Sequence, residues 1–489
     1  MSRLAQFALA ANDAGRIFQF ISAGSLIPLL VCLIYHEYDA LLPMAAAPAS
    51  FFALGTIFRY VPRPKKEPGF GVTLASVALI WLFAALLSAL PFYLILDMAF
   101  VDCFFEAMSG WTDTGMTMLV SVDDTPKTLL FWRSLMQWLG GLGIVAFTIS
   151  LASRSGLIQK SLYRSEGRSE AFMPSVVATG FQMWKIYIVL TGIGVLMILL
   201  TGVGLWDAVN LSMCALATGG FTVHSAGISY YDNHALEFIL IPLMIAGAIP
   251  FKIYYALYNG RSLRAFRNGP ALLLFSFVGI LGLILTSSLV YQNNFEIAEA
   301  FRQGMFMSSA AVTSTGYQIT NPSLWHVSSI LLISLVMISG GCLGSTAGGL
   351  KLDRVLIFGK GFVWMLKRLS VHSKVLVPFR QDRRVIPGQQ VEFELSKQLF
   401  TIIGYLLMIQ LAILVLLLFN SDQSLPGLIF DTASAFGNNG ISTGFISPDS
   451  DIPTKLIYTM LMWLGRLELL PVLMLIIGIV KGFEYIPSE

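Results

Sequence analysis

One short apolar stretch, residues 102–116, constrains the fold of this chain most strongly. It reads DCFFEAMSGWTDTGM, an apolar run of helical character that turns polar around Thr112 to Gly115. A helix of this length cannot cross a bilayer, because spanning needs about 20 apolar residues. Its polar end would also be unsatisfied in hydrocarbon unless it lined an aqueous cavity. The stretch therefore predicts a half-helix that enters the membrane and stops at a pore.

Four glycines anchor four copies of this pattern: Gly115 in TDTGM, Gly220 in ATGGF, Gly316 in TSTGY and Gly440 in GNNGI. Every copy carries small residues eight, six and five positions before its glycine. These residues are Ala107, Ser109 and Gly110; Ser212, Cys214 and Ala215; Ser308, Ala310 and Ala311; and Thr432, Ser434 and Ala435. Positions five and eight before the glycine share one helical face, which allows close packing against a neighbour. The sequence therefore indicates a four-fold internal repeat.

The composition predicts a polytopic membrane protein. The 489 residues are 56% hydrophobic and 12% charged, whereas soluble domains are about a quarter charged. The four cysteines lie in apolar surroundings without metal-type spacing, so neither a disulfide nor a zinc site is expected. No catalytic nucleophile and base pair stands out in the apolar segments, so an enzyme is not expected.

The apolar segments divide the chain into five parts. An N-terminal helix pair is expected at 16–36 and 41–60, within a part that spans residues 1–66. Four units follow at 67–153, 154–257, 258–358 and 359–489, each with a long helix, a half-helix and a second long helix. The first helices are expected at 71–96, 186–204, 272–291 and 399–419. The second helices are expected at 129–151, 236–257, 328–358 and 456–480, which gives ten spanning helices and four half-helices.

Charge alternates between successive connections. The connections between units are basic, with Arg154, Lys160, Arg164, Arg168, Arg261, Arg264, Arg267, Lys360, Lys367, Arg368, Lys374, Arg380, Arg383 and Arg384. The turns around the half-helices are acidic, with Asp123, Asp124, Asp232, Glu296, Glu299, Asp422, Asp449 and Asp451. The positive-inside rule then places both termini and the basic connections in the cytoplasm, so the repeats run in the same sense. We predict an all-α polytopic membrane protein with four parallel repeats around a central pore, plus an N-terminal helix pair.

The glycine turns suit cation binding. Rings of backbone carbonyl oxygens replace the hydration shell of a cation, and glycine leaves no side chain in the path. A half-helix that enters from outside directs its negative C-terminal end at the pore, which favours cations. The alternative is a set of re-entrant turns with a packing role only.

Seven sequence motifs resemble those of the Trk/Ktr/HKT potassium transporters, most closely the bacterial TrkH branch. They are SGWTDTG, ATGGF, TSTGY, FGNNG, WLGGLG, GGCLGSTAGGLK and WLGRLEL, and they span nearly the whole chain. The resemblance implies K⁺ transport, with the ion held at backbone carbonyls of a selectivity filter. The implied filter residues are Thr112, Asp113, Thr114, Gly115, Thr218, Gly219, Gly220, Ser314, Thr315, Gly316, Asn438, Asn439 and Gly440.

Asp113 departs from the family pattern, which usually has an uncharged residue such as Thr at this position. A carboxylate that faced the ions could bind Na⁺ or divalent cations and weaken the preference for K⁺. A carboxylate that pointed behind the strand would instead bond to the scaffold, and we expect this second arrangement.

Residues 339–349 contain five glycines among eleven residues. Their hydroxyls and free carbonyls suit an irregular segment beside an aqueous cavity, and the resemblance implies a gating loop below the filter. The implied gate residues are Gly340, Gly341, Gly344, Ser345, Thr346, Gly348, Gly349, Lys351 and Arg466. The alternative is close helix packing, because Gly340, Gly344 and Gly348 form two GxxxG steps.

Arg466 lies deep in an apolar segment, where a charge usually faces a cavity or a partner. The resemblance implies that it restricts the pore beneath the filter, and snorkelling to an interface is the alternative. Glu468 is two residues further on, so we expect it to meet a different partner. Glu106 could brace the filter through backbone amides, and only Asp431 matches it in another copy.

The sequence contains no Walker A motif, so any nucleotide control is expected to act through another chain. The resemblance implies a cytosolic TrkA-type nucleotide-binding subunit, a homodimer and the bacterial inner membrane. The basic segment 360–384 is the expected docking region, although it could equally face lipid headgroups. No nucleic-acid partner is expected. We therefore predict K⁺ uptake through a gated, cation-selective pore. The alternatives are an H⁺- or Na⁺-coupled symporter and a less selective Na⁺/K⁺ pathway caused by Asp113.

Overall fold

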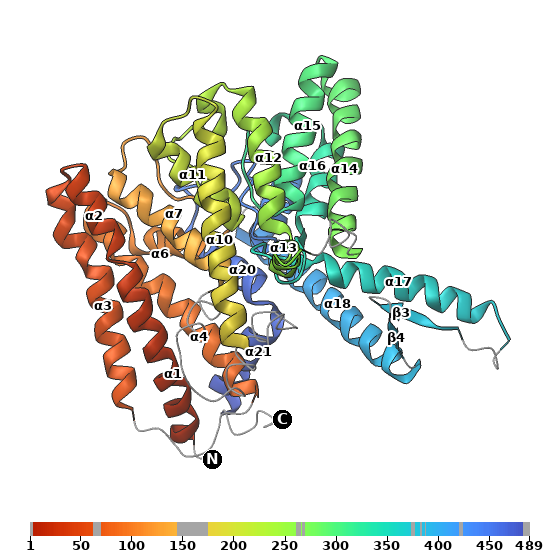
Figure 1. Ribbon diagram of the computed structural model, residues 1–489, viewed down its shortest axis with the longest axis horizontal. Helices are drawn as coiled ribbons and strands as arrows, with labels where there is room; N and C mark the ends of the chain where they lie inside the picture. Colours follow the sequence, from red (N-terminus) through yellow and green to blue (C-terminus); the bar gives the residue numbers. More distant parts are fainter. Residues whose placement is uncertain are drawn as a thin grey trace.

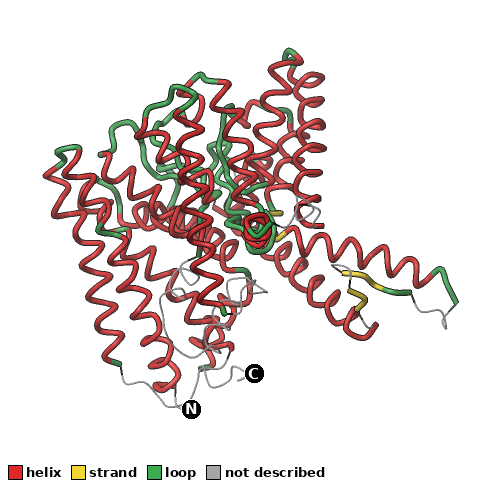
Figure 2. Tube along the Cα trace, viewed as in Figure 1, coloured by secondary structure: helices red, strands yellow, loops and turns green. Residues whose placement is uncertain are grey.

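The computed structural model describes residues 3–61, 70–143, 175–260, 266, 269–372, 377–381, 384–386, 388–419 and 424–482. Helices account for most of this part of the chain, and only two short strand pairs occur in it (Figures 1 and 2). Six described helices are long and apolar enough to cross a membrane, or eight if each of two bent pairs forms one span. The prediction of an all-α polytopic membrane protein is confirmed.

The N-terminal pair has two spans. The first is formed by α1 (Arg3–Gly24) and α2 (Ile27–Ile34), and the second by α3 (Leu41–Tyr60), which a short 3₁₀ turn, Tyr38–Ala40, precedes. The first helix begins earlier than the expected residue 16, because its polar residues bond to α3. Asn12 donates to the Arg59 carbonyl over 3.0 Å, and Arg59 donates to the Gln19 amide oxygen over 2.9 Å. Gly15 lies against the Gly55 carbonyl, where a Cβ would collide. Close backbone contact therefore joins the two helices.

Each of the four units contains a long first helix and a half-helix, as predicted. The first helices are α4 (Phe70–Ser88) with its extension α5 (Leu90–Ile95), α10 (Val176–Leu199), α14 (Gly269–Asn293) and α18 (Gly388–Phe419). The half-helices are α6 (Phe100–Trp111), α11 (Leu205–Ala217), α15 (Ile297–Val312) and α19 (Leu425–Phe436). Short 3₁₀ turns at Gly227–Tyr231 and Pro322–Leu324 follow the second and third half-helices.

The second helices predicted at 236–257 and 456–480 are not continuous, whereas the break within 328–358 falls at the irregular segment expected at 339–349. Helices α12 (His234–Ala248) and α13 (Phe251–Tyr258) meet at 97°, and α20 (Ile452–Leu467) and α21 (Leu469–Lys481) meet at 116°. In the third unit, α16 (Val327–Met337) and α17 (Leu352–Leu369) are separated by a loop. Helix α7 (Lys127–Leu142) ends within the predicted 129–151, and the rest of that range lies outside the described residues.

Two of these three breaks have a local physical cause. Pro250 lacks the amide hydrogen that would continue α12 into α13. Glu468 has φ 63°, a left-handed conformation that ends α20. The carbonyls freed at the α12 break accept bonds from the loop of the third unit, from Cys342 N to Ala248 O over 3.0 Å and from Thr346 N to Gly247 O over 3.2 Å. The breaks therefore gather around one loop.

Two strand pairs frame the polar segments. Strand β1 (Ser339–Gly340) pairs in parallel with β2 (Leu350–Lys351) and closes the loop 341–349 at its base. Strand β3 (Phe379–Gln381) pairs antiparallel with β4 (Arg384–Ile386) beside α17 and α18. Helices α17 and α18 form an arm that extends away from the body (Figure 1). The predicted basic residues Arg154, Lys160, Arg164, Arg168, Arg261, Arg264, Arg267, Lys374 and Arg383 lie outside the described residues.

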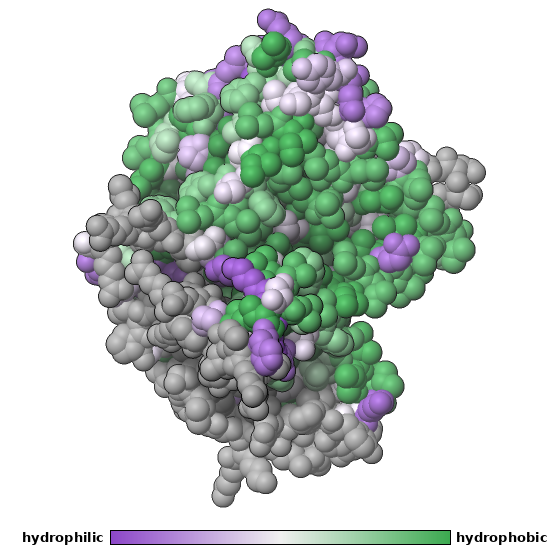
Figure 3. Space-filling view, turned by 90° about the vertical axis from the view of Figure 1, so that its right-hand side faces the viewer, coloured by the Kyte–Doolittle hydropathy of each residue, from purple (hydrophilic) through white to green (hydrophobic). Residues whose placement is uncertain are grey.

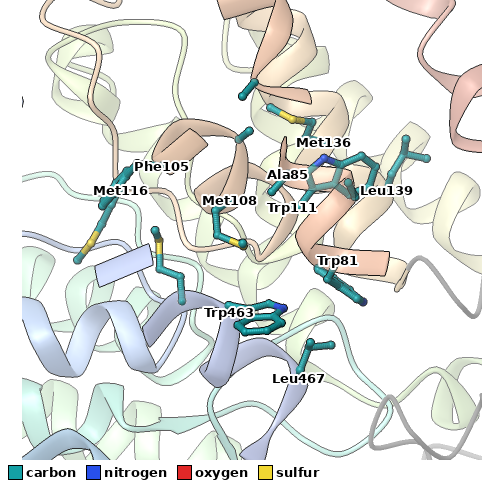
Figure 4. Close-up of a cluster of buried hydrophobic side chains, with 14 of the residues drawn as sticks. Trp81, Ala85, Phe105, Met108, Trp111, Met116, Met136, Leu139, Trp463 and Leu467 are labelled. Atoms are coloured by element: carbon teal, nitrogen blue, oxygen red, sulfur yellow. The ribbon is translucent and has the colours of Figure 1, made fainter. Parts of the chain in front are cut away.

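The described residues on the face seen in Figure 3 are largely apolar. Leu200, Leu418 and Val480 are each at least 75% exposed, which is the arrangement expected of side chains that face lipid. The interior is packed with aromatic and methionine side chains. Trp81, Trp111 and Trp463 come from α4, α6 and α20 and surround the end of the first half-helix (Figure 4). Trp111 Nε1 donates to the Ser88 hydroxyl over 2.8 Å, so a polar bond also fixes this half-helix.

Candidate functional site

The four anchoring glycines form a closed ring. Each has a positive φ: 91° at Gly115, 77° at Gly220, 79° at Gly316 and 87° at Gly440. A Cβ on each would collide with a carbonyl oxygen of the next unit. The four collisions are Gly115 with Gly219 O, Gly220 with Thr315 O, Gly316 with Asn439 O, and Gly440 with Thr114 O. The fourth unit thus returns to the first, and both the backbone angle and the space require glycine.

The half-helices end in the same turn in all four units. Asp113, Thr218, Ser314 and Asn438, two residues before each glycine, have φ between 50° and 58°. The next residue donates its amide to a carbonyl five residues earlier, over 2.9–3.0 Å. These bonds are Thr114 N to Ser109 O, Gly219 N to Cys214 O, Thr315 N to Ala310 O and Asn439 N to Ser434 O. This is the left-handed cap that ends many helices, so the four strands leave their helices with one geometry.

Buried acids brace two of the four strands. Glu106 accepts the Met118 amide over 2.8 Å, and Asp431 accepts the Thr443 amide over 2.8 Å. Both amides lie three residues after the ring glycine, so the contact predicted for Glu106 is present and its match in Asp431 works in the same way. Glu106 also forms an ion pair of 2.7 Å with Arg133. Both side chains of that pair are at most 2% exposed.

Sequence reasoning missed Arg133 and Gln137 on α7. Arg133 donates to Thr222 O over 3.0 Å, and Gln137 donates to Gly219 O over 2.5 Å and accepts the Phe221 amide over 3.1 Å. Their spacing of four residues puts both on one helical face. A charged residue within an apolar helix is itself a signal of an interior partner, and that signal could have identified Arg133.

We expect Glu106→Gln to lower the stability of the purified protein more than Asp431→Asn. The first change leaves the buried Arg133 charge without its carboxylate, which typically costs about 3–5 kcal/mol. Asp431 is held instead by hydroxyl and amide donors from Ser442, Thr443 and Ile446. Thermal unfolding in detergent, followed by size-exclusion chromatography, measures the difference. Equal losses in the two variants would contradict the importance of the Arg133 pair.

A polar cavity of about 500 Å³ lies on one side of the ring. All four ring glycines line it, and so does the residue two positions after each of them: Thr117, Thr222, Gln318 and Ser442. The predicted acidic residue Asp123 lies at this side, where its carboxylate bonds to Ser225 and His224. The hydrogen bond from the Ser225 hydroxyl is the main reason that the pKa of Asp123 lies below its usual value. Asp123 therefore stays ionised near the cavity.

The loop 341–349 packs against the opposite side of the ring. The hydroxyls of Thr346 and Thr218 lie 3.2 Å apart, and the Thr346 hydroxyl also contacts Leu216 O and Gly247 O at 2.9 Å. A Cβ on Gly348 would meet the Asn438 side chain, and one on Gly340 would meet Gly348 O. Lys351 donates to Ala347 O within the loop. The segment is not helical, so the alternative of a GxxxG-packed helix is wrong.

The other predicted residues of this loop have separate places. Gly341 lies against Ala248, and Gly349 lies against Gly437 at the end of α19. Gly344 has φ 79°, and its carbonyl accepts the Phe251 amide over 3.1 Å. The Ser345 hydroxyl donates to Cys342 O over 2.6 Å. The structure therefore brings the loop residues together beside the ring.

Arg466 joins the loop, the first unit and the ring. Its guanidinium donates to Thr346 O and Gly140 O over 2.5 Å and to Gly141 O over 3.1 Å. Its Nη2 also lies 3.1 Å from a carboxylate oxygen of Asp113. The Arg466 side chain is 8% exposed, so the alternative of snorkelling to an interface is wrong. Glu468 has a different partner, as predicted, and pairs with Arg354 on α17.

Main-chain oxygens arranged in a ring inside a membrane suit the dehydration of a cation, so fold and ring together define a cation-transport membrane protein. The chain belongs to the TrkH family of cation transport proteins, because the family model matches residues 75–481. The family resemblance inferred from the motifs is confirmed. Members of this family transport ions, so the prediction that the chain is not an enzyme is also confirmed.

Three similar proteins illustrate the family. An uncharacterized cation transporter of Methanocaldococcus jannaschii is 31% identical over 463 residues, which cover 94% of this chain and 93% of the relative. The Trk system potassium uptake protein TrkH of Escherichia coli K12 is 29% identical over 404 residues, which cover 79% of this chain and 81% of the relative. The crystal structure of the potassium transporter TrkH from Vibrio parahaemolyticus shares the fold with a TM-score of 0.84. It is 24% identical, and the match covers 98% of this chain and 99% of that one.

Proposed function

We propose that this protein takes up K⁺ through the ring of four glycine strands. The observation that carries the proposal is the cyclic contact of each ring glycine with a carbonyl of the next unit. Several relatives carry potassium uptake in their names, among them TrkH of Escherichia coli. The thirteen residues from Thr112 to Gly115, Thr218 to Gly220, Ser314 to Gly316 and Asn438 to Gly440 form the selectivity filter, and K⁺ rests at their backbone carbonyls.

Three features support cation selectivity at this ring. The C-terminal ends of four half-helices meet there, and each carries partial negative charge. The ring positions are all glycine, so no side chain enters the path. The cavity outside the ring is polar and lies beside the ionised Asp123, which raises the local concentration of cations.

The inner side of the ring acts as a gate in this proposal. The loop 341–349 and Arg466 lie directly against the strand residues Thr218, Asn438 and Asp113. Ions that left the ring inward would meet this loop. Movement of the loop and of Arg466 therefore controls permeation.

We expect a protonophore to leave gradient-driven Rb⁺ entry into proteoliposomes unchanged. The ring is one continuous set of contacts around a single axis, which suits ions that move down their own gradient. A symporter coupled to H⁺ or Na⁺ would instead alternate access around an occluded site. Loss of Rb⁺ entry on adding the protonophore would favour H⁺ coupling, and a requirement for external Na⁺ would favour Na⁺ coupling.

The partners and the membrane are part of the same proposal. A homodimer in the bacterial inner membrane, with both termini in the cytoplasm and lipid around the apolar surface, agrees with the exposed apolar side chains. Nucleotide control acts through a cytosolic TrkA-type subunit, since this chain has no nucleotide motif. The arm formed by α17 and α18 presents the exposed residues Lys360, Lys367 and Arg368, which suit docking of that subunit. In this proposal the chain divides into an N-terminal helix pair, 1–66, and four pore units, 67–153, 154–257, 258–358 and 359–489.

A further inference from the structure

Asp113 is the one acidic residue at an otherwise neutral position of the ring. The matching residues in the other units are Thr218, Ser314 and Asn438. All four share the left-handed turn, and the polar groups of the other three contact the inner elements of the fold. Thr218 meets Thr346, Asn438 donates to Met462 O over 2.8 Å, and the Ser314 hydroxyl lies beside Gly340. A side chain at this position therefore points behind the strand, toward the inner loop, as we expected for Asp113, but among the described residues neither of its carboxylate oxygens accepts the scaffold hydrogen bond that we also expected.

The partner of Asp113 at that side is Arg466. Their closest charged atoms lie 3.1 Å apart, and the side chains are 0% and 8% exposed. Among the residues that the structure describes, Asp113 is the only carboxylate within ion-pair distance of Arg466. The other bonds of Arg466 go to the neutral carbonyls of Gly140, Gly141 and Thr346. Asp113 therefore supplies the compensating charge for a buried guanidinium.

The burial makes this compensation important. A cation on the proposed path must pass from the ring to the loop, and both Asp113 and Arg466 border that passage. An unpaired positive charge in a low-dielectric surrounding repels a cation far more strongly than in water. A paired guanidinium acts as a dipole instead, and its repulsion falls off quickly with distance. Within the described residues no hydrogen bond to either Asp113 carboxylate oxygen accompanies this contact, so the compensation is electrostatic.

We propose that Asp113 is a positioning residue that neutralises Arg466 and holds its guanidinium against the first unit. The proposal rests on the proposed function, in which the ring and the loop form the ion path. It assigns to Asp113 a role in the rate of permeation rather than in the choice between K⁺ and Na⁺. The effect of Asp113 must then depend on the presence of Arg466.

The test compares Asp113→Asn, Arg466→Gln and the double variant by radiolabelled Rb⁺ uptake into proteoliposomes. Asp113→Asn leaves the Arg466 guanidinium without its carboxylate on the inner side of the ring, so we expect the maximal rate to fall roughly ten-fold. The apparent KM for Rb⁺ and the preference for Rb⁺ over Na⁺ should stay unchanged, because the ring carbonyls are intact. Arg466→Gln in the same background should restore the rate to that of Arg466→Gln alone.

The control is Asp102→Asn, which removes a half-buried acid from α6, the half-helix that precedes Asp113. Asp102 pairs with Lys455 over 2.6 Å and not with Arg466, so Arg466→Gln should not rescue any loss it causes. The proposal would be overturned if the effects of the two single substitutions on the rate multiplied in the Asp113 and Arg466 double variant, since that would mean the two residues act independently. A changed Na⁺ preference that persists in the absence of Arg466 would also overturn it. If Asp113→Asn fails to fold, recovery of the folded protein in the double variant supports the pairing, and continued failure overturns it. Substitution of a ring glycine tests the proposed function separately, since that result does not depend on Arg466.

Discussion

Gly316→Ala should reduce gradient-driven Rb⁺ flux by a hundred-fold or more, which corresponds to a rise on the order of 3 kcal/mol in the barrier to permeation. A methyl group at this position would collide with Asn439 O, so the carbonyl of the fourth unit would have to leave the ring. The φ of 79° adds strain for a residue with a Cβ. Because one displaced oxygen changes the coordination of the ion, the remaining flux should also discriminate less between K⁺ and Na⁺. Uptake of radiolabelled Rb⁺ and Na⁺ into proteoliposomes measures both effects.

Gly202→Ala is the matched control for this substitution. Gly202 has a similar φ of 87°, but a Cβ there would have no atom within 4 Å. The two variants therefore share the backbone strain and differ in the collision. If Gly202→Ala lost as much flux as Gly316→Ala, the effect would reflect strain alone, and the role of the ring in permeation would be contradicted.

Arg466→Ala should raise basal Rb⁺ flux by roughly ten-fold at equal amounts of protein. The guanidinium ties the loop at Thr346 to the end of α7 at Gly140 and Gly141. Its removal frees the loop and takes away the side chain that bridges the loop and the first unit, so the inner passage opens more often. The measurement is uptake in the absence of any cytosolic partner, where a closed gate limits the rate.

Arg302→Ala is the control for the loss of an arginine. Arg302 pairs with Glu299 and Glu237 at 2.5 Å and does not contact the loop, so its replacement should not raise flux. Unchanged or lower flux in Arg466→Ala, with the protein folded, would count against a gate at this residue.

The glycine pattern predicted the half-helices because its information is local. A short apolar run, its small residues and the glycine after a polar turn lie within about fifteen residues, and the structure places α6, α11, α15 and α19 where those runs occur. The same locality explains why the ring positions were recognised as equivalent. The closure of the ring, from Gly440 back to Thr114, follows from the parallel order of the four units.

The broken second helices could not be predicted in the same way. The run 456–480 contains no charged residue apart from Arg466 and Glu468, so its hydropathy alone indicates one spanning segment. Its bend at Glu468 is held by Arg354, which belongs to a different unit. The carbonyls freed beyond Gly247 are likewise satisfied by the distant loop residues Cys342 and Thr346. Pro250 is a local signal for the α12 break, but the contacts that hold both bends come from residues far apart in the chain, and a hydrophobic pattern does not contain them.

The partner of Asp113 could not be predicted either, because Arg466 lies in a different unit, far away in the chain. From the sequence alone the Asp113 side chain could face either the ions or the scaffold, and only the shared turn of the four strands selects one of these directions. The match between Glu106 and Asp431 is the opposite case, since their equal distance from the ring glycine was visible along the chain.

Covalent linkage of the four strands has an evolutionary consequence. In a pore assembled from four copies of one subunit, any substitution appears four times, and a carboxylate next to the ring would bring four negative charges. Here a change at Asp113 alters only one of the four units of the ring, and a single Arg466 on another unit can compensate its charge. A gene that encodes all four units can therefore vary each unit independently and acquire asymmetry by single substitutions.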